Sequence, residues 1–477
     1  MPQKPNILLI HADQHRFDCL GAYGNIDIRT PNIDSLAADG VVFENSFCPY
    51  PICTPSRYSL LTGLYVHQHL GFTNRSTIPA GFPTLPRQLK PQGYKTAAVG
   101  KMHFTPTYLD VGFDSMFLAE QCGAGRYDDD YHRWLQSEGL CDRIDLIDQE
   151  AEFRKDAPPE YWQTFGAMPS NLDESHHSTT WIGNHAVEVI HDWEQGGNFL
   201  MVGFIKPHHP FDPPVPWDRM YHPGELTLLP GWTEKLIHGD DGSGYFPFGE
   251  LSETQLRRVM ALYYASISQI DFHVGKMIER LEDKGLYDRT IIVYTSDHGE
   301  YLGYHHRLLK AYRMLEPLVR IPLIIKFAGK GNSGGRDARL VNNVDVAPTL
   351  LSAAGISIPE TMTGLDLTDA CAENDYVFAE DSKEYMVRSK TRKLLLHRDL
   401  QQSMFFDLTR DATEMNNLYT HRAHQEEIRQ YRDVLLEWIL FRNRATNHLD
   451  MAAPQCRAQN VPKEAGKLYA YFKKQMA

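Results

Sequence analysis

Short apolar runs, each bounded by polar or turn-forming residues, recur along most of the 477-residue chain. Five of them lack the alternation of a half-exposed strand and are typical of strands buried on both faces. They span 6–10 (NILLI), 95–100 (KTAAVG), 198–205 (NFLMVGFI), 290–296 (TIIVYTS) and 321–327 (IPLIIKF). Between them, apolar residues return at helical spacing over 253–284, and further helices are expected over 55–63, 178–195 and 344–355. This succession predicts an α/β domain with a mostly parallel central sheet flanked by helices.

The pattern changes near residue 370, where the apolar segments become short and alternating. They predict a small antiparallel sheet, followed by a helix over about 423–442. We therefore expect a large domain over 1–370 and a smaller C-terminal α+β subdomain with a tail over 371–477. Within the large domain, residues 120–178 are polar and are interpreted as an insertion that roofs a pocket.

Composition and charge narrow the possible partners. The net charge of −13 disfavours nucleic acid and anionic membrane as partners. No apolar run reaches the roughly 18 residues of a membrane helix. The N-terminus lacks the apolar region and cleavage site of a signal peptide, and the 7 cysteines are scattered without close pairs. We therefore expect a cytoplasmic protein, with a trimmed secreted or periplasmic chain as the alternative and a homo-oligomer left open.

One cysteine stands in the unusual stretch PYPICTPSRYSLLTG, residues 49–63. Proline suits the first position of a helix, so Pro55 predicts that Cys53 lies just ahead of a helix N-terminus. The backbone N–H groups there favour an anion, and Arg57 can lean back toward the same place. The alternative is a buried structural cysteine beside a surface arginine.

Two polar dipeptides follow predicted strands. Asp13 and Gln14 end the first strand, and Asp297 and His298 follow TIIVYTS. In an open α/β sheet, ligands gather outside the carboxyl ends of the strands, so these side chains are expected to converge. Their oxygen-rich donor set suits Ca²⁺ or Mg²⁺ better than zinc.

Cations and proton donors also follow predicted strands. VGKMHF places Lys101 and His103 after the second apolar run, where strand alternation would point both side chains the same way. KPHHPF supplies His208, and GYHHRLLKAYR supplies Lys310. A lone lysine is usually a solvated charge and a lone histidine a structural group, but the shared placement after strands favours one site.

These motifs resemble those of the type I sulfatases of the alkaline-phosphatase-like superfamily. The resemblance rests on NILLIHADQ, CTPSRYSLLTG, GYKTAAVGKMHF, KPHHPF, TSDHGEYLGYH and FFDLTRDATEMNNL, in this order. It implies that 1–370 is the catalytic domain of a sulfuric ester hydrolase that cleaves a sulfate monoester. It also implies that a formylglycine-generating enzyme oxidises Cys53 to formylglycine, which as the hydrate attacks sulfur.

The resemblance further implies a role for each matching residue. A divalent cation, Ca²⁺ with Mg²⁺ or Mn²⁺ as alternatives, is expected on Asp13, Gln14, Cys53, Asp297 and His298. Arg57 and Lys101 are expected to orient the nucleophile, and His103 to assist the release of sulfate. His208 and Lys310 are expected to bind sulfate and assist the leaving alkoxide. Many sulfatases carry a second aspartate in place of Gln14, which leaves the identity of the metal open.

Three other readings compete with a sulfatase. The first is a phosphonate monoester or phosphodiester hydrolase of the same superfamily. This class resembles the chain at the metal site and shares an asparagine at the position of Asn74. It typically carries tyrosine and threonine in place of Lys101 and His103. A non-catalytic relative would have lost part of the charged set. A thiolate nucleophile at Cys53 would use a longer loop to its arginine and no metal.

The small anionic substrate is expected to be a sulfated sugar or an aryl sulfate. Asn74 and His305 are the predicted substrate-binding residues. A polar, histidine-rich rim favours a sugar. Further rim candidates are His67, Arg75, His306, Arg307 and the insertion around Arg126 to Arg133.

Overall fold

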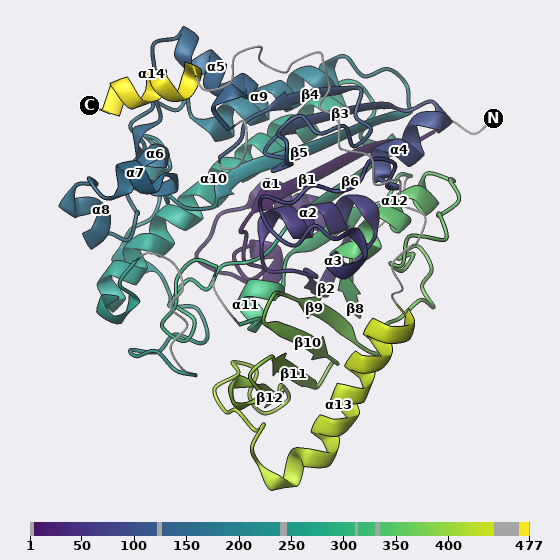
Figure 1. Ribbon diagram of the computed structural model, residues 1–477. Helices are drawn as coiled ribbons and strands as arrows, with labels where there is room; N and C mark the ends of the chain where they lie inside the picture. Colours follow the sequence, from purple (N-terminus) through teal and green to yellow (C-terminus); the bar gives the residue numbers. More distant parts are fainter. Residues whose placement is uncertain are drawn as a thin grey trace.

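A computed structural model describes residues 4–121, 126–238, 246–310, 313–329, 334–442 and 467–476. It contains a large sheet of eight strands flanked by helices and a separate antiparallel sheet of four strands (Figure 1). The predicted fold class is therefore confirmed. The domain boundary near residue 370 stays a prediction.

The large sheet has the strand order β4-β3-β5-β1-β6-β7-β2-β8. Its strands are β1 (Asn6–Asp13), β2 (Val41–Phe47), β3 (Lys95–Gly100), β4 (Ser115–Leu118), β5 (Asn198–Pro207), β6 (Thr290–Ser296), β7 (Leu323–Lys326) and β8 (Gly335–Asn342). β1 lies between β5 and β6 and is parallel to both. β7 is antiparallel to β6 and to β2, so the sheet is mixed but mostly parallel.

All five predicted strands are present, and three further strands were missed. β2 (VVFENSF) is interrupted by Glu44 and Asn45, which breaks the apolar run. β8 (GRDARLVN) is an edge strand that begins with polar residues, and β4 is an edge strand of only 4 residues. Edge strands carry little of the continuous apolar pattern that marks a central strand.

Helices cover both faces of the large sheet (Figure 1). Leu8 and Ile10 of β1 pack in one apolar cluster with α1 (Pro31–Asp39), α9 (Ser178–His191) and α10 (Glu253–Asp283). The alternate residues, Ile7 and Leu9, pack in the second cluster with α2 (Cys53–Thr62), α4 (Leu85–Leu89) and α12 (Val346–Ala353). Successive side chains of a strand point to opposite faces, which explains the unbroken apolar run of β1.

Shorter helices complete the large domain. These are α3 (Val66–His69), α5 (Asp130–Ser137), α6 (Arg143–Gln149), α7 (Ala151–Arg154), α8 (Pro159–Gln163) and α11 (Glu316–Val319). Four of them, α5 to α8, occupy the segment that was interpreted as an insertion. Across the described ranges, no helix combines the length and the apolar character that crossing a membrane requires.

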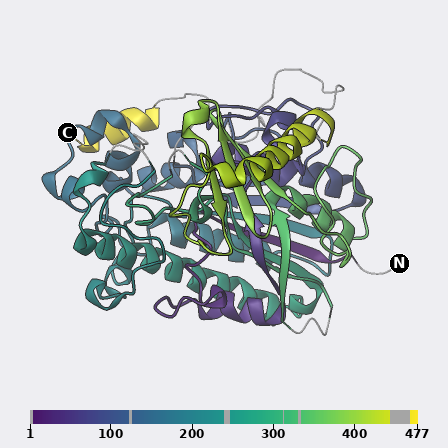
Figure 2. The same ribbon diagram turned by 90° about the horizontal axis from the view of Figure 1, so that it is seen from below.

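The small sheet has the order β12-β11-β10-β9 and is antiparallel throughout. Its strands are β9 (Val377–Glu380), β10 (Glu384–Arg388), β11 (Arg392–His397) and β12 (Met404–Asp407). One face packs on α13 (Gln425–Glu437), which lies across the sheet in Figure 2. The other face contacts Leu318 and Val319 of α11, next to the loops that follow β6. The last described helix, α14 (Lys467–Met476), packs through Phe472 on Tyr127, Leu146 and Phe153.

Candidate active site

The carboxyl ends of β1 and β6 bring the two acidic dipeptides together. The two strands are parallel neighbours, and Ala12 lies opposite Ser296 in their register. The next residue on each strand is therefore Asp13 or Asp297. The chain turns sharply after β1, because Gln14 has a φ of 64° and donates its backbone N–H to Asp297 Oδ1 at 3.0 Å. The predicted convergence of these strand ends is what the structure shows.

Cys53 begins helix α2. The sequence predicted the first helical residue at Pro55, but the helix starts at Cys53, and the extended Ile52 precedes it. Asn74 Oδ1 accepts the backbone N–H of Thr54 at 3.1 Å, which satisfies one of the free N–H groups of the first turn. Asn74, predicted to bind substrate, therefore lies at the N-terminus of the helix that carries Cys53.

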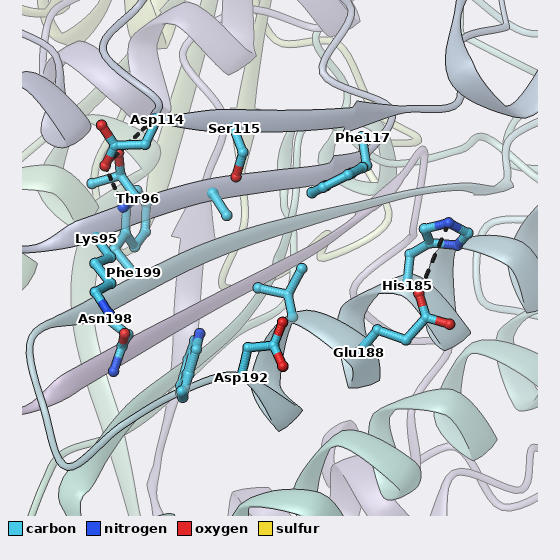
Figure 3. Close-up of a pocket in the computed structure, with 13 residues that line it drawn as sticks. Lys95, Thr96, Asp114, Ser115, Phe117, His185, Glu188, Asp192, Asn198 and Phe199 are labelled. Atoms are coloured by element: carbon cyan, nitrogen blue, oxygen red, sulfur yellow. Dashed lines mark hydrogen bonds and ion pairs between the residues drawn. The ribbon is translucent and has the colours of Figure 1, made fainter.

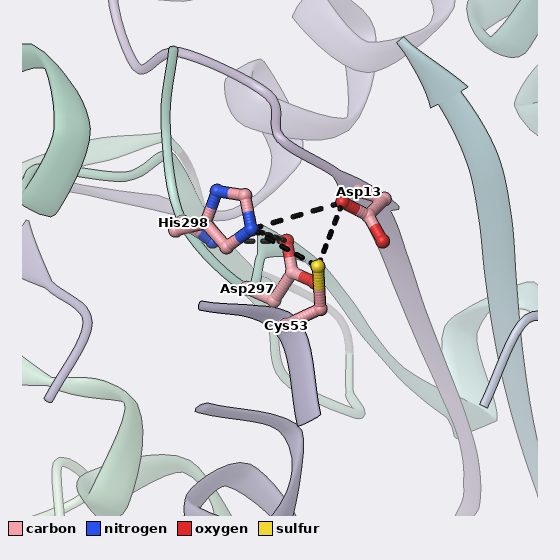
Figure 4. A group of neighbouring side chains, drawn as sticks. All are labelled: Asp13, Cys53, Asp297 and His298. Carbon is pink, nitrogen blue, oxygen red and sulfur yellow. Dashed lines mark hydrogen bonds and ion pairs between the residues drawn. The ribbon is translucent and has the colours of Figure 1, made fainter. Parts of the chain in front are cut away.

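Four side chains face one another at this place, from β1, from α2 and from the loop after β6 (Figure 4). Cys53 Sγ lies 3.6 Å from Asp13 Oδ1 and 3.3 Å from His298 Nε2. His298 Nε2 lies 4.0 Å from Asp297 Oδ1. One ligand atom from each of the four residues lies within 4.8 Å of all the others, and all four residues are buried.

Two cations hold the outer carboxylate oxygens. Arg57 bridges Asp13 Oδ2 and Asp297 Oδ2, each at 2.8 Å. Lys101 Nζ also contacts Asp13 Oδ2, at 2.7 Å. Burial alone would raise the pKa of Asp13, but the nearby cations, Lys101 first, bring this pKa well below its usual value. The carboxylates stay ionised, and their Oδ1 atoms remain directed at the cluster.

The donor set fits a divalent cation. Gln14 Oε1 is buried without a hydrogen-bond partner among the described residues, while the same amide donates its N–H to Glu300. His298 Nδ1 donates to the Gly299 carbonyl at 3.0 Å, which leaves Nε2 to act as a ligand atom. An unpartnered amide oxygen, two carboxylates and a pre-oriented imidazole are ligands that a hard cation accepts.

Lys310 contacts the cysteine and His208. Lys310 Nζ is 2.9 Å from Cys53 Sγ and 2.7 Å from His208 Nε2. Burial raises the pKa of the Cys53 thiol and Asp13 adds to this rise, but Lys310 and His298 outweigh both, so the pKa is lowered overall. The structure thus brings together a buried sulfur, a lysine and a histidine at one helix terminus.

His103 follows β3, as Lys101 does, but its backbone does not continue the conformation of the strand. β3 ends at Gly100, and His103 has a φ of 56°, so the rule that would align it with Lys101 does not apply. Its carbonyl accepts the Thr54 hydroxyl at 2.8 Å, which ties this turn to α2. Burial, reinforced by Lys101, lowers the pKa of His103 well below its usual value, so the ring is neutral.

Glu120 supports the turn and was not predicted as a site residue. Its carboxylate accepts the backbone N–H groups of Met102 and His103, at 3.0 and 2.9 Å. Glu120 follows β4, and the residues FLAEQ gave no signal because this strand was itself missed. Burial raises the pKa of Glu120 to about 8.

The raised pKa of Glu120 predicts a pH-dependent stability. Between an unfolded pKa near 4.5 and a folded pKa of about 8, only the folded state keeps the proton, so unfolding becomes easier as the pH rises. Glu120→Gln removes this slope. We expect the melting temperature of the variant to rise relative to wild type between pH 5 and pH 8.5, as measured by calorimetry. A constant difference across this range would contradict the protonated state.

His305 lies elsewhere. Its Nε2–H donates to the Thr413 carbonyl at 2.7 Å, and its ring stacks on Tyr304. These contacts place His305 under the loop that follows β12, and none of them reaches the Cys53 cluster. Its predicted contact with substrate gains no support from this position. His306 likewise packs on Trp232 rather than on the cluster.

A pocket of about 530 Å³ lies at the amino ends of β3, β4 and β5, beside α9 (Figure 3). Phe117, His185 and Asp192 are among the residues that line it. None of its lining residues belongs to the Cys53 cluster. The candidate chemistry is therefore concentrated at the carboxyl ends of the strands and not in this pocket.

Comparison with known proteins identifies sulfatases among the relatives of this chain. A family model described as sulfatase matches residues 5–356, and one described as N-sulphoglucosamine sulphohydrolase, C-terminal, matches residues 300–439. An arylsulfatase of Clostridium perfringens is 31% identical over 470 residues, which cover 91% of this chain and 94% of the relative. An N-acetylglucosamine-6-O-sulfatase of Bacteroides thetaiotaomicron is 27% identical, with 91% and 86% covered.

The fold has relatives among solved structures as well. The phosphonate monoester hydrolase of Agrobacterium radiobacter aligns with a TM-score of 0.75 at 22% identity, over 95% of this chain and all of the other. This likeness concerns the fold. The sulfatase model covers most of the chain, and the arylsulfatase relative spans nearly all of it. The resemblance found in the motifs is thus confirmed, and the chain belongs to the sulfatase family of enzymes.

Proposed function

We propose that this enzyme hydrolyses a sulfate monoester, either an aryl sulfate or a sulfated sugar. The observation that carries the proposal is that Cys53 meets three metal-type donors, Asp13, Asp297 and His298, and also contacts Lys310, which in turn contacts His208. Relatives named arylsulfatase and N-acetylglucosamine-6-O-sulfatase support the substrate class.

Two groups complete the proposed machinery. A formylglycine-generating enzyme converts Cys53 to formylglycine, which in its hydrated form supplies a hydroxyl nucleophile for the sulfur atom. Asp13, Gln14, Asp297 and His298, with residue 53, hold a divalent cation. When bound, the cation supplies Lewis-acid stabilisation of charge. Ca²⁺ fits the oxygen-rich set best, with Mg²⁺ and Mn²⁺ as alternatives.

The cationic side chains bind and orient the sulfate group. Lys310 and His208 are one hydrogen bond apart, and the Lys310 ammonium donates toward His208 Nε2 because His208 Nδ1 is already a donor to a carbonyl. This arrangement holds a proton where the leaving oxygen gains charge. Lys101 and Arg57, which both contact the Asp13 carboxylate, offset negative charge around residue 53.

His103 has the role of proton acceptor in the release of sulfate. A buried, neutral imidazole is a competent base, and loss of a positioned base lowers the rate by about 10²-fold or more. We therefore expect His103→Gln to lower kcat for an aryl sulfate about 10²-fold, with intact metal content. Steady-state kinetics and elemental analysis of one preparation test this. An unchanged kcat would remove His103 from the mechanism.

The test of the proposed function is product formation. Formylglycine-bearing protein is incubated with an aryl sulfate and with a panel of sulfated mono- and disaccharides, and free sulfate is measured by ion chromatography. We expect sulfate release from at least one class. Failure to release sulfate from any of them, by protein that carries the aldehyde and a metal, would contradict the proposal.

The alternative function is hydrolysis of phosphonate monoesters or phosphodiesters. The fold shared with a phosphonate monoester hydrolase is compatible with both functions. Lys101 and His103, which follow β3, match the sulfatase pattern. The alternative class typically carries tyrosine and threonine at these two positions.

A further inference from the structure

We propose that Gln121 is a positioning residue that couples Lys101 to the loop carrying His208. This inference rests on the proposed function, because it concerns two residues assigned to that reaction. Gln121 lies shortly after β4 and is completely buried. No motif in the sequence singled it out.

Both the oxygen and the nitrogen of the Gln121 amide form hydrogen bonds. Its Oε1 accepts Lys101 Nζ at 3.2 Å. Its Nε2 donates to Asp145 Oδ1 at 2.7 Å and to the His209 carbonyl at 2.8 Å. A primary amide has two N–H groups, so both are engaged and the orientation of the amide is determined by its partners. A glutamate would place an oxygen against Asp145 and the carbonyl, which both lack a proton to donate.

The His209 carbonyl connects Gln121 to His208. His208 Nδ1 donates to this carbonyl at 2.7 Å, since a carbonyl oxygen can only accept. This hydrogen bond fixes the tautomer of His208 and directs its Nε2 at Lys310, 2.7 Å away. The position of the His209 carbonyl therefore determines how His208 meets Lys310. Gln121 holds that carbonyl and the Lys101 ammonium in one rigid unit.

Helix α6 braces the same loop from the insertion. Asp148 Oδ2 contacts His209 Nδ1 at 2.5 Å, and Gln149 Nε2 donates to the His209 carbonyl at 3.1 Å. Gln149 is thus a second amide donor to this carbonyl, and the contacts described for it do not include Lys101. Gln149→Met removes a donor to the same oxygen and leaves Gln121 in place, which makes it the matched control.

The expected defect is weaker proton donation to the leaving group. A methionine at position 121 keeps the approximate volume and removes all three hydrogen bonds. Misplacement of a catalytic group by a fraction of an ångström lowers rates without weakening substrate binding in proportion. The loss should be greatest for aryl sulfates with poor leaving groups, which depend most on proton donation.

The kinetic experiment uses the metal-loaded, formylglycine-bearing protein and aryl sulfates whose phenols differ in pKa. For Gln121→Met, kcat should fall about 10-fold with poor leaving groups and about 2-fold with activated ones, with KM within about 2-fold. Gln121→Glu should behave like Gln121→Met, because it keeps the acceptor for Lys101 and loses the donors. Gln149→Met should lose about 3-fold or less, with no dependence on the leaving group.

A structural measurement separates this inference from the proposed function. Crystal structures of wild type, Gln121→Met and Gln149→Met should be compared. The contact between His208 Nε2 and Lys310 Nζ should be broken in Gln121→Met and kept in the other two. If wild type cleaves no sulfate ester, the proposed function fails, and this contact alone decides the inference. A preserved contact in Gln121→Met, or a rate loss equal for all leaving groups and matched by a lower melting temperature, would overturn it.

Discussion

Cys53→Ala should lower kcat/KM for an aryl sulfate by about 10⁴-fold or more, because it removes the precursor of the nucleophile. The side chain is fully buried at the start of α2 and lies 2.9 Å from Lys310 Nζ. No neighbouring hydroxyl or thiol in the described cluster can replace it. Steady-state kinetics measure the loss, and peptide mass spectrometry of active wild type should show an aldehyde at residue 53.

Cys48→Ala is the matched control for this variant. Cys48 is also a buried, free cysteine, but it packs with the apolar residues beside the small sheet. Its loss should cost about 1–2 kcal/mol of stability through a small cavity and leave kcat unchanged. Full activity in Cys53→Ala, or a thiol at residue 53 in every active preparation, would contradict the role of Cys53.

Asp297→Asn should strip most of the divalent cation from the site and lower kcat/KM about 10³-fold. The substitution keeps the shape of the side chain and removes one of the two carboxylate charges in the cluster. It also leaves the buried Arg57 with a single ionised partner, Asp13, which is costly for a cation out of water. Elemental analysis of the dialysed variant gives the metal content, and kinetics give the rate.

Asp192→Asn provides the control for a lost carboxylate. Asp192 lines the pocket of Figure 3, away from the Cys53 cluster. Its variant should keep metal content and rate within about 2-fold, as surface substitutions usually do. A full complement of metal in Asp297→Asn would show that the ends of β1 and β6 do not form one metal site.

The position of the site could be predicted from the sequence because its residues follow strands with strong patterns. β1 and β6 are central strands, buried along their whole length and with clear apolar runs, so the sequence showed that Asp13 and Asp297 stand where these strands end. Their convergence then follows from parallel pairing. The resemblance added the roles, which no pattern of hydrophobicity contains.

The supporting residues could not be predicted, for identifiable reasons. Glu120 and Gln121 follow β4, an edge strand of 4 residues whose pattern is too short to recognise. Their partners lie in other segments of the chain. Glu120 accepts the backbone N–H groups of Met102 and His103, and Gln121 contacts Lys101, Asp145 and the carbonyl of His209, which nothing local in the sequence indicates. His305 differs from them, because its polarity suggested a place on the rim although it packs under the loop after β12. Its contact with substrate stays a prediction.

Helix and strand ends show the same limit. The pattern placed the start of α2 at Pro55, while the helix begins at Cys53, and this shift puts the sulfur on the first turn rather than ahead of it. A proline is tolerated throughout the first turn of a helix, so it does not determine which residue is first. Such local differences decide how a side chain is aimed, and the structure is needed to see them.

The assignment as a sulfatase is tested most directly on wild-type protein that carries formylglycine and metal. Its kcat/KM is compared for one aryl sulfate and one aryl phosphonate monoester with the same phenol. Identical leaving groups make the comparison one of sulfuryl against phosphonyl transfer. With Lys101 and His103 following β3, we expect a clear preference for the sulfate. A large preference for the phosphonate monoester would contradict it and assign the protein the alternative function.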